Sequence, residues 1–381
     1  MKILTWAQRK LGDIANVDSS KRIHRSEYTK EGIPFFRGSE ITDRKISNLI
    51  YISKKKYNEI KNQYGVPKPG DLLITAVGTI GNIWKVDNTS FYYKDGNLIH
   101  INPKCIDEDY LVYYFQFLKY KKIIDRVASG SNQKALTIIK VQNLKIKYPQ
   151  KEGQSLIGVL LKKTENLIAL QQRKLQQLKL LKKAMLQDLF TDKNVPKLRF
   201  NGFDANWIQC KLEKEALLTM GQSPSGSTYS DQPSTYILVQ GNADLKNGWV
   251  KPRIWTTQIT KLAKKGDIII TVRAPAGKVG RTNFDVVLGR GVASIQGNDF
   301  IFYLLSKMDM NKYWKKYAAG STFESINSDD IKNTRVHVPN LPEQNRIANL
   351  FLRLDDLIRF QQNKLNNLQK TKQFLFQNMF I

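Results

Sequence analysis

Apolar residues recur at alternating spacings of three and four along two segments that are rich in Lys and Gln. The first register runs from Ile157 to Leu189, and the same register returns 190 positions later, from Ile347 to Met379. Seven of its ten positions are apolar in the first segment and eight in the second. Such spacing predicts two long amphipathic helices whose apolar residues form a coiled-coil seam. The first seam consists of Ile157, Leu161, Thr164, Ile168, Gln171, Leu175, Leu178, Lys182, Met185 and Leu189.

The polar exceptions in the seam repeat as well. Gln171 and Lys182 in the first segment return as Gln361 and Lys372 in the second. Polar groups in a seam reduce stability but fix register and partner, so we expect the two helices to face each other as an antiparallel pair. Each helix of about 36 residues would be about 54 Å long. The alternative is two independent basic helices, each packed on its own domain.

Short apolar runs, punctuated by Gly, Pro, Asn and Asp, make up the rest of the chain. The runs "DLLITAV" from Asp71 and "DIIITV" from Asp267 each begin at a Gly-Asp turn and predict buried strands. Amphipathic spacing predicts helices over Tyr110–Val127 and Asp299–Tyr317. This mixture is typical of α+β domains.

Several motifs occur twice in the same order, which indicates a tandem duplication. "WAQRKLGDIA" from Trp6 returns loosely as "WIQCKLEKEA" from Trp207, and "ASGSNQKALTIIKVQNLKI" from Ala128 returns as "AAGSTFESINSDDIKNTRV" from Ala318. We therefore predict two tandem α+β domains, separated by two long helices that pair as an antiparallel coiled coil with a pseudo-two-fold axis. The predicted boundaries are 1–149 for the first domain, 150–190 for its helix, 191–204 for a linker, 205–339 for the second domain and 340–381 for its helix.

The chain carries a formal net charge of +28, from 61 Lys and Arg against 33 Asp and Glu. This surplus indicates a polyanionic partner, usually nucleic acid; the alternative is a general basic bias unrelated to any partner. Because the basic residues are spread along the whole chain, we expect them on folded surfaces rather than in a tail. Two cysteines and three histidines lie far apart without a metal-ligand spacing.

No apolar run approaches the roughly 18 residues that a membrane span requires, and "MKILTWAQRKLGD" lacks the apolar core of a signal peptide. We therefore expect a soluble, cytoplasmic protein that does not bind membranes. One rival interpretation is a structural or membrane-associated coiled-coil protein whose basic helices hold acidic lipid. It would explain the seam but not the duplicated, loop-rich domains.

Two similar basic domains joined by helices of fixed length are suited to reading a split site on double-stranded DNA. Lys and Arg would contact phosphates, and polar side chains on the Gly-punctuated loops would read base edges. Because the paired loops differ in sequence, the predicted target is bipartite and asymmetric. The candidate DNA-binding residues are Arg37, Ser39, Thr79, Asn82, Ser131, Asn132, Gln133 and Lys134 in the first domain, and Gln222, Ser223, Tyr229, Gln240, Asn242, Arg273, Lys278, Ser321 and Thr322 in the second. For each of them the alternative is an ordinary solvated turn.

The sequence predicts no catalytic residues and no metal site. "AGKVG" from Ala276 has Val279 where a phosphate-binding loop needs Ser or Thr. "EIK" at Glu59 resembles a fragment of a nuclease metal site, but the second repeat does not preserve it. We found no Pro-Pro-aromatic motif for methylating an exocyclic amine, so we expect this chain to recognise DNA while another protein performs the chemistry.

In its order of motifs the sequence resembles the specificity (S) subunit of type I restriction-modification systems. The motifs are "KLGDI", "IPFFRGSEI", "GDLLITAVGTIGN", "MGQSPSGSTY", "PEQNRIANLF" and the linker "PKLRFNGFDANW". The resemblance covers essentially the whole chain. It implies two target recognition domains and two spacer helices, assembled with two DNA-adenine methyltransferase (M) subunits and, through them, two restriction (R) subunits. It also implies that S-adenosylmethionine, ATP and Mg²⁺ belong to the partners and that this chain binds no cofactor.

The first repeat departs from the family pattern at two places. "NVDSSKRI" from Asn16 stands where the second repeat has "GQSP", and "PQKEGQSLI" from Pro149 stands where the second has "LPEQNRI". The resemblance also implies that the exposed sides of both helices contact M subunits, with Lys162, Lys163 and Arg173 at the rim. The alternative within this class is a specificity subunit whose restriction and methylation partner is one fused polypeptide.

Overall fold

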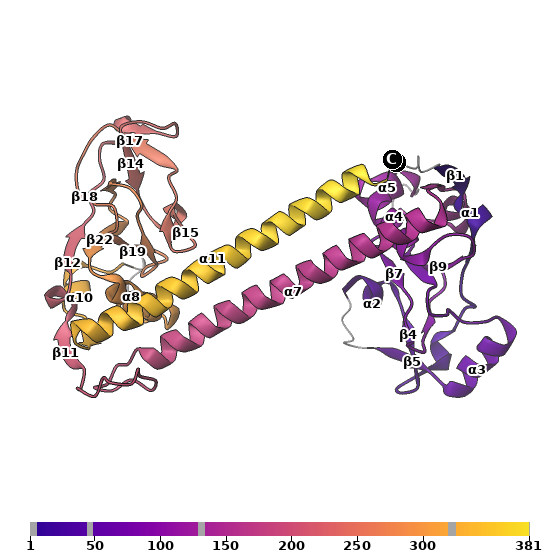
Figure 1. Ribbon diagram of the computed structural model, residues 1–381, viewed down its shortest axis with the longest axis horizontal. Helices are drawn as coiled ribbons and strands as arrows, with labels where there is room; N and C mark the ends of the chain where they lie inside the picture. Colours follow the sequence, from indigo (N-terminus) through magenta and orange to yellow (C-terminus); the bar gives the residue numbers. More distant parts are fainter. Residues whose placement is uncertain (1–5, 44–48, 129–133, 319–324, 381) are drawn as a thin grey trace. The chain divides into compact units, whose positions relative to one another are not determined.

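The protein, described here from a computed structural model, consists of two compact units that share both long helices (Figure 1). The structure describes residues 6–43, 49–128, 134–318 and 325–380. The first unit comprises Met1–Gln172 and Lys364–Ile381, and the second comprises Arg173–Asn363. Helix α7 (Lys151–Leu189) and helix α11 (Leu341–Asn378) each begin in one unit and end in the other.

The first unit contains two small sheets and a two-stranded ribbon. One sheet is antiparallel, in the order β2 (Ala15–Asp18), β9 (Leu98–Pro103), β6 (Leu72–Thr75) and β7 (Ile83–Lys85). The other has the order β3 (Tyr28–Thr29), β5 (Ile50–Ile52), β4 (Ile33–Phe36) and β8 (Tyr92–Tyr93), with β4 and β8 parallel. The ribbon pairs β1 (Ala7–Lys10) with β10 (Lys145–Tyr148). The helices are α1 (Leu11–Ile14), η1 (Arg25–Glu27), α2 (Gly38–Asp43), α3 (Lys54–Gln63), α4 (Glu108–Tyr120), α5 (Ile123–Val127) and α6 (Ile138–Gln142).

The second unit repeats this plan with more strands. Its larger sheet has the order β12 (Leu217–Met220), β22 (Val292–Gln296), β19 (Ile268–Thr271), β20 (Val279–Arg281), β16 (Trp249–Val250) and β15 (Leu245–Lys246). Its smaller sheet has the order β13 (Tyr229–Ser230), β17 (Ile254–Thr256), β14 (Tyr236–Val239), β21 (Val286–Leu288) and β18 (Leu262–Ala263). The ribbon pairs β11 (Ile208–Lys211) with β23 (Arg335–Val338). The helices are η2 (Leu212–Lys214), η3 (Gly226–Thr228), η4 (Asn242–Asp244), α8 (Asp299–Met310), α9 (Lys315–Ala318) and α10 (Ser328–Lys332).

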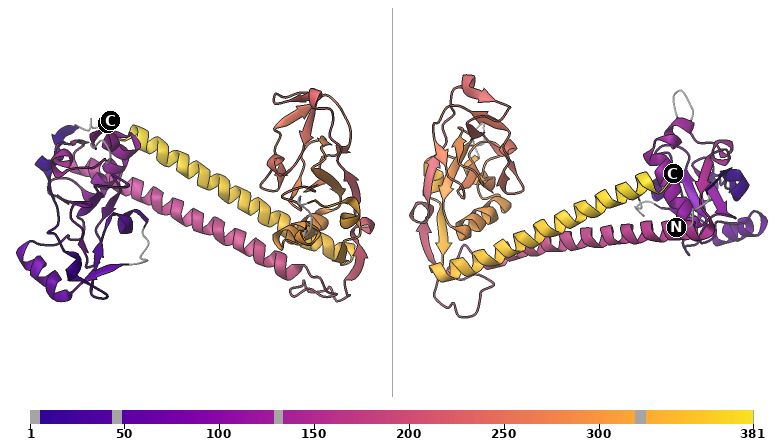
Figure 2. Two further views of the ribbon diagram at one scale, coloured as in Figure 1. Left: turned by 180° about the vertical axis from the view of Figure 1, so that it is seen from behind. Right: turned by 45° about the horizontal axis from the view of Figure 1, so that its top comes forward.

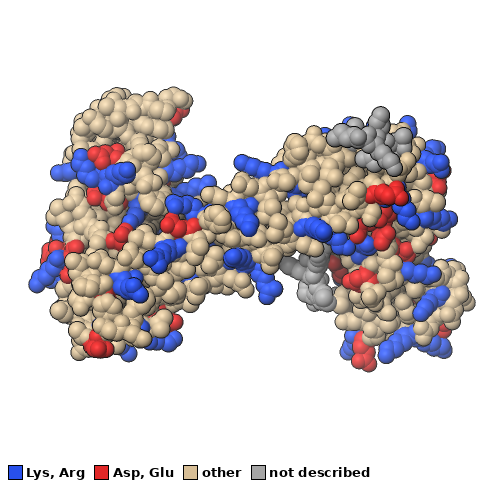
Figure 3. Space-filling view, viewed as in Figure 1, with Lys and Arg blue, Asp and Glu red and all other residues tan. Residues whose placement is uncertain are grey.

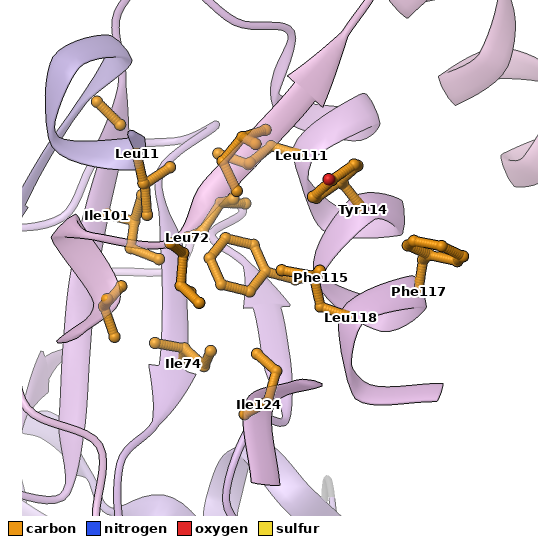
Figure 4. Packing of buried hydrophobic residues seen from close by; sticks show 14 of the residues in the cluster. Leu11, Leu72, Ile74, Ile101, Leu111, Tyr114, Phe115, Phe117, Leu118 and Ile124 are labelled. Carbon is orange, nitrogen blue, oxygen red and sulfur yellow. The ribbon is translucent and has the colours of Figure 1, made fainter. Parts of the chain in front are cut away.

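The predicted buried strands are confirmed, and each separates two hydrophobic cores. In β6, Leu72 and Ile74 face the core under α4, while Leu73 faces the core of the other sheet. Side chains alternate along a strand, so a strand covered on both faces is apolar at every position. Figure 4 shows Leu72 and Ile74 packed against Leu111 and Phe115 of α4. In β19, Ile268 and Ile270 likewise lie in one core and Ile269 in another.

The two helices predicted over Tyr110–Val127 and Asp299–Tyr317 are each broken into two. Helix α4 starts at a capping Asp107, whose carboxylate accepts a 2.8 Å hydrogen bond from the Tyr110 N–H, and α8 starts at a capping Asn298. The breaks fall at Lys122 (φ 56°) and Lys312 (φ 57°). A left-handed backbone cannot continue a right-handed helix. The prediction of helical structure in these two segments was therefore correct, but the prediction of one continuous helix in each was wrong.

The long helices run antiparallel within each unit. In the first unit the start of α7 lies beside the end of α11, and in the second unit the end of α7 lies beside the start of α11 (Figures 1 and 2). All ten predicted seam positions of each helix are buried or half-buried. The end of each helix also contacts its unit's core: Phe380 packs 5.6 Å from Tyr110, and Phe190 packs 4.9 Å from Phe300, measured between ring centres. The predicted α+β halves with paired long helices are confirmed.

Candidate nucleic-acid interface

Four kinds of loop occur in both units and carry most of the predicted DNA-binding residues. We call them the leading loop, which precedes η1 or η3, the upper loop after β4 or β14, which includes the first residues of α2 or η4, the central loop after β6 or β19, and the crossover loop after β8 or β21. They comprise residues 19–24, 37–39, 76–82 and 94–97 in the first unit, and 221–225, 240–242, 272–278 and 289–291 in the second.

A buried threonine hydroxyl fixes the shape of each central loop. Thr75 Oγ1 donates to the Thr79 carbonyl and accepts a 2.9 Å hydrogen bond from the Asn82 N–H. In the second unit, Thr271 Oγ1 donates to the Pro275 carbonyl (2.7 Å) and accepts from the Lys278 N–H (2.9 Å). The loop conformation therefore depends on an inward-facing group and on backbone atoms, while the side chains between them are left to vary.

The last residue of each central loop is tethered to the helix that follows the sheet. Lys119 Nζ of α4 donates to Asn82 Oδ1, and Lys278 Nζ donates to Asp309 Oδ1 of α8 at 2.9 Å. Lys119 and Asp309 lie 190 positions apart and occupy equivalent sites. Asn82 and Lys278, both predicted DNA-binding residues, are thus engaged within their own units, Asn82 through its side-chain acceptor and Lys278 through its donor.

The residues that follow the loop predicted at Ala128–Lys134 contact the central loop in the first unit, and their counterparts do so in the second. The Leu136 N–H donates to the Ala76 carbonyl (2.8 Å), and the Ile326 N–H donates to the Val272 carbonyl (2.9 Å). Lys134 is exposed beside this junction. The predicted residues Ser131, Asn132, Gln133, Ser321 and Thr322 lie outside the described part of the chain. Arg273 is exposed on the central loop next to the second junction.

The upper loops are each organised by a buried carboxylate. Glu40 accepts from the Arg37 backbone N–H (2.7 Å), from Arg37 Nη2 (2.7 Å) and from the Ser39 hydroxyl (3.0 Å). Burial alone would raise the pKa of the Glu40 carboxyl, but the hydrogen bonds from Arg37 and Ser39 outweigh it and lower that pKa. The predicted residues Arg37 and Ser39 are therefore held in place by one acid.

Asp244 has the same role in the second unit. It accepts from the backbone N–H groups of Gln240 (2.7 Å) and Gly241 (3.2 Å), and from Arg253 Nε (3.0 Å). Gln240 is half-buried and Asn242 is exposed beside it. Arg253 was not predicted from the sequence. It comes from the loop before β17, and only the fold brings it to the upper loop.

The leading loop of the second unit contains two predicted residues, and a third, Tyr229, follows it in β13. Gln222 is exposed, and its N–H donates to the Leu288 carbonyl at 2.9 Å. The Ser223 hydroxyl accepts a 3.0 Å hydrogen bond from the Arg290 N–H. The Tyr229 hydroxyl donates back to the Pro224 carbonyl of the leading loop at 3.3 Å. Arg290 is a second residue that the sequence analysis did not identify, although the run "GRG" between two apolar strands was a usable signal.

Basic residues are distributed over the surface of each unit. Figure 3 shows Lys and Arg across the visible face, with Asp and Glu among them. Among the described residues there is no group of three or more His, Cys, Asp or Glu side chains arranged to hold a metal ion. None of the described helices is long and apolar enough to cross a membrane. The described surface thus carries basic side chains, which can contact DNA phosphates, and loops with hydrogen-bond donors and acceptors, which can contact base edges in a groove.

Comparison with known proteins gives the family. Residues 3–180 and 219–370 match the profile described as the type I restriction modification DNA specificity domain. The chain belongs to this family. Each matched stretch covers most of one duplicated half, so the halves are DNA specificity domains, and the chain is a specificity protein of the type I class rather than a lipid-binding coiled coil.

Individual relatives agree with this assignment. The chain is 29% identical over 389 residues to a protein described as the MjaX specificity subunit of a type I restriction enzyme from Methanocaldococcus jannaschii, covering 96% of this chain and 91% of that one. It is 30% identical over 207 residues to the MjaIX specificity subunit of the same organism, covering 48% and 46% of the two chains. The alternative of a fused restriction and methylation partner finds no support among these relatives.

Solved structures share the fold. The type I specificity subunit from M. genitalium matches with a TM-score of 0.62 at 13% identity, covering 100% of this chain and 97% of that one. The HsdS subunit from Thermoanaerobacter tengcongensis matches with a TM-score of 0.52 at 20% identity, covering 98% and 96%. The predicted architecture of two tandem halves with paired helices is confirmed.

Proposed function

We propose that this chain selects a bipartite, asymmetric DNA site for a type I restriction-modification complex. One observation carries the proposal: the same loop framework occurs twice, with different outward side chains. Arg37 in one upper loop corresponds to Gln240 in the other, and Val77 in one central loop corresponds to Arg273. Since base edges are distinguished by the donors and acceptors that face them, two such heads read two different half-sites.

Phosphate contacts supply most of the affinity in this proposal. The net charge of +28 favours DNA over neutral or basic partners. We expect binding to weaken steeply as salt is raised. Association releases the cations condensed on DNA, and this release is less favourable when the salt concentration in solution is high.

The partners in this proposal are two methyltransferase subunits on the long helices, with two restriction subunits bound through them. Apolar side chains stay exposed on the helix faces away from the seam, namely Leu167 and Leu170 in the first unit and Leu357 and Phe360 in the second. The members of each pair lie 190 positions from their counterparts. A large partner that covered these side chains would remove apolar surface from water. At the predicted rim, Lys162 pairs with Asp109 (3.1 Å), while Lys163 and Arg173 are exposed.

The chain itself is proposed to be non-catalytic and to bind no cofactor. S-adenosylmethionine, ATP and Mg²⁺ would act on the partner subunits, and the complex would work in the cytoplasm. A purified chain that methylated or cut DNA without partners would contradict this part of the proposal.

The test is long-read sequencing that detects methyladenine in DNA from cells expressing this chain with its methyltransferase, compared with cells expressing the methyltransferase alone. We expect methyladenine at one split, asymmetric motif only when this chain is present. Replacing residues 205–339 with another recognition domain should change one half-site and leave the other half-site and the gap unchanged. Methylation that is absent, or identical without this chain, would contradict the proposal.

A further inference from the structure

The crossover loop of the second unit presents one exposed arginine on a fixed backbone. Residues 289–291 connect β21 of the smaller sheet to β22 of the larger one. The flanking residues Leu288 and Val292 are fully buried, whereas Arg290 is exposed. The position of Arg290 is therefore set by two strands that belong to different sheets.

Three other loops are hydrogen-bonded to this short segment. From the leading loop, the Gln222 N–H donates to the Leu288 carbonyl (2.9 Å), and the Ser223 hydroxyl accepts from the Arg290 N–H (3.0 Å). Where β14 ends and the upper loop begins, the Gly289 N–H donates to the Val239 carbonyl at 2.8 Å. From the central loop, the Val272 N–H donates to the Gly291 carbonyl at 2.9 Å. Arg290 thus stands where the loops bearing Gln222, Ser223, Gln240 and Arg273 converge.

Glycines make this convergence tight. A Cβ atom on Gly291 would lie 2.1 Å from the Gln240 carbonyl oxygen, and one on Gly221 would lie 2.1 Å from the Gly289 carbonyl oxygen. Both obstacles are backbone atoms, which cannot rotate away. The loops therefore approach each other through their main chains and direct side chains such as that of Arg290 outward.

The charge of Arg290 is not neutralised within its unit. Two other basic side chains near these loops are paired, Arg253 with Asp244 at 3.0 Å and Lys278 with Asp309 at 2.9 Å. For Arg290, no acidic partner occurs among residues 173–318 and 325–363, the part of this unit that is described. Its guanidinium group is available to an external acceptor.

The first unit has an exposed arginine at the same junction, supplied by the other loop. There the Lys94 N–H donates to the Phe36 carbonyl at 2.8 Å, as Gly289 does to Val239, so Asp95 occupies the position of Arg290. Asp95 Oδ2 accepts a 2.8 Å hydrogen bond from Arg22 Nε. Arg22 precedes η1 by three residues, as Ser223 precedes η3, and its side chain is 71% exposed.

We infer that Arg290 reads a guanine in one DNA half-site and that Arg22, oriented by Asp95, reads a guanine in the other. The inference rests on the proposed function. Arginine donates two parallel hydrogen bonds to guanine O6 and N7, the commonest specific contact in the major groove. A planar donor fork on a fixed backbone suits this acceptor pair better than the flexible point charge of lysine. Each half-site then contains a G·C pair that the protein requires.

The experiment compares Arg290→Ala and Arg290→Lys with the wild type, each as the full chain expressed with its methyltransferase. Methyladenine mapping gives the motif, and the methylation rate of a wild-type site gives the efficiency. We expect both variants to lose the requirement for one G·C pair in a single half-site and to methylate the original site about 10- to 100-fold more slowly. The other half-site and the gap should stay unchanged. Arg22→Ala should relax the opposite half-site.

Arg335→Ala is the matched control, because Arg335 is exposed on the β23 ribbon of the same unit. It should leave both half-sites intact, and thermal melting should show that all variants fold. If Arg290→Lys keeps the motif and the rate of the wild type, Arg290 contacts phosphate rather than a base and the inference is wrong. If Arg290→Ala keeps both, Arg290 has no role in recognition. A wild-type chain that directs no split motif would instead contradict the proposed function, whatever the variants do.

Discussion

Lys372 of α11 and Glu165 of α7 form an ion pair across the helix seam of the first unit, with 2.7 Å between Nζ and Oε1. The Tyr113 hydroxyl of α4 donates to the other oxygen of Glu165 at 2.9 Å. The second unit repeats the arrangement with residues 190 positions away: Lys182 pairs with Asp355 (2.5 Å), which accepts from the Tyr303 hydroxyl (2.8 Å). The polar seam positions thus connect both long helices to the core of their unit.

Removing the lysine from this arrangement should destabilise the first unit. In Lys372→Met the apolar stem is kept, but Glu165 loses its cation while it stays half-buried against Tyr113. We expect a loss of about 1 kcal/mol in the free energy of unfolding, measured as a shift of the urea midpoint. Lys370→Met, at an exposed position of the same helix, should change it by less than about 0.5 kcal/mol. Equal shifts in the two variants would show that the ion pair contributes nothing.

The stability of the first unit should fall as pH rises from about 6.5 to 9. His100 of β9 bonds Asp18 of β2 through Nδ1 and Asp71 beside β6 through Nε2, both at 2.8 Å. Burial alone would lower the His100 pKa, but the two carboxylates outweigh it and raise the pKa to about 9. A folded pKa above the unfolded value of about 6.5 means that the charged form stabilises the fold. That contribution, about 3 kcal/mol at most, is complete below pH 6.5 and is lost as pH passes 9.

His100→Gln provides the check, because glutamine keeps a donor but does not titrate. Melting temperatures of wild type and variant should converge as pH rises from 6.5 to 9.5. A wild-type melting temperature that falls no more steeply than that of the variant would exclude His100 as the cause.

Gly291→Ala should weaken recognition of one half-site. The added Cβ would lie 2.1 Å from the Gln240 carbonyl oxygen, so the crossover and upper loops must separate, at a cost of about 1–3 kcal/mol. Thermal melting and methyladenine mapping should both report the change, with the motif altered in one half-site only. The control is Gly226→Ala, where a Cβ would meet no atom within 4 Å. If Gly291→Ala matches that control, the loops are looser than the structure indicates.

Neutralising the buried acids of the upper loops should affect the two half-sites separately. Glu40→Gln removes the ion pair that holds Arg37, and Asp244→Asn removes the one that holds Arg253. Each loss should lower stability by about 2 kcal/mol and relax one half-site in methyladenine mapping. The half-site relaxed by Glu40→Gln should be the one left unchanged by Asp244→Asn. If one variant relaxes both half-sites, the assignment of one half-site to each unit is wrong.

The sequence was sufficient for features that repeat at a regular spacing. The seam, including Lys182 and Lys372, follows from helical periodicity, and the buried strands β6 and β19 follow from apolar runs after Gly-Asp turns. The sequence was insufficient where the backbone conformation of a single residue ends a helix. Nothing about Lys122 or Lys312 as a residue type predicts the left-handed backbone that splits each predicted helix.

The candidate interface was predictable as loops but not as contacts. Gly-punctuated stretches identified the central and upper loops, and the fold brings them together. The partners came from elsewhere in the chain: Arg253 reaches Asp244 from the loop before another strand, and Arg290 reaches Ser223 across 67 positions. Such pairings depend on strand order, which periodicity does not specify. The nominated DNA contacts therefore remain predictions.

The buried hydroxyls of Thr75 and Thr271 have a consequence for how such proteins change over generations. Because an inward group and main-chain atoms hold each central loop, an outward residue can be replaced without rebuilding the loop. A lineage can therefore acquire a new DNA target through one or a few substitutions while its fold and its partner surfaces persist. Point mutations in one unit can then change the DNA sequence that this unit recognises, both in natural selection and in laboratory engineering.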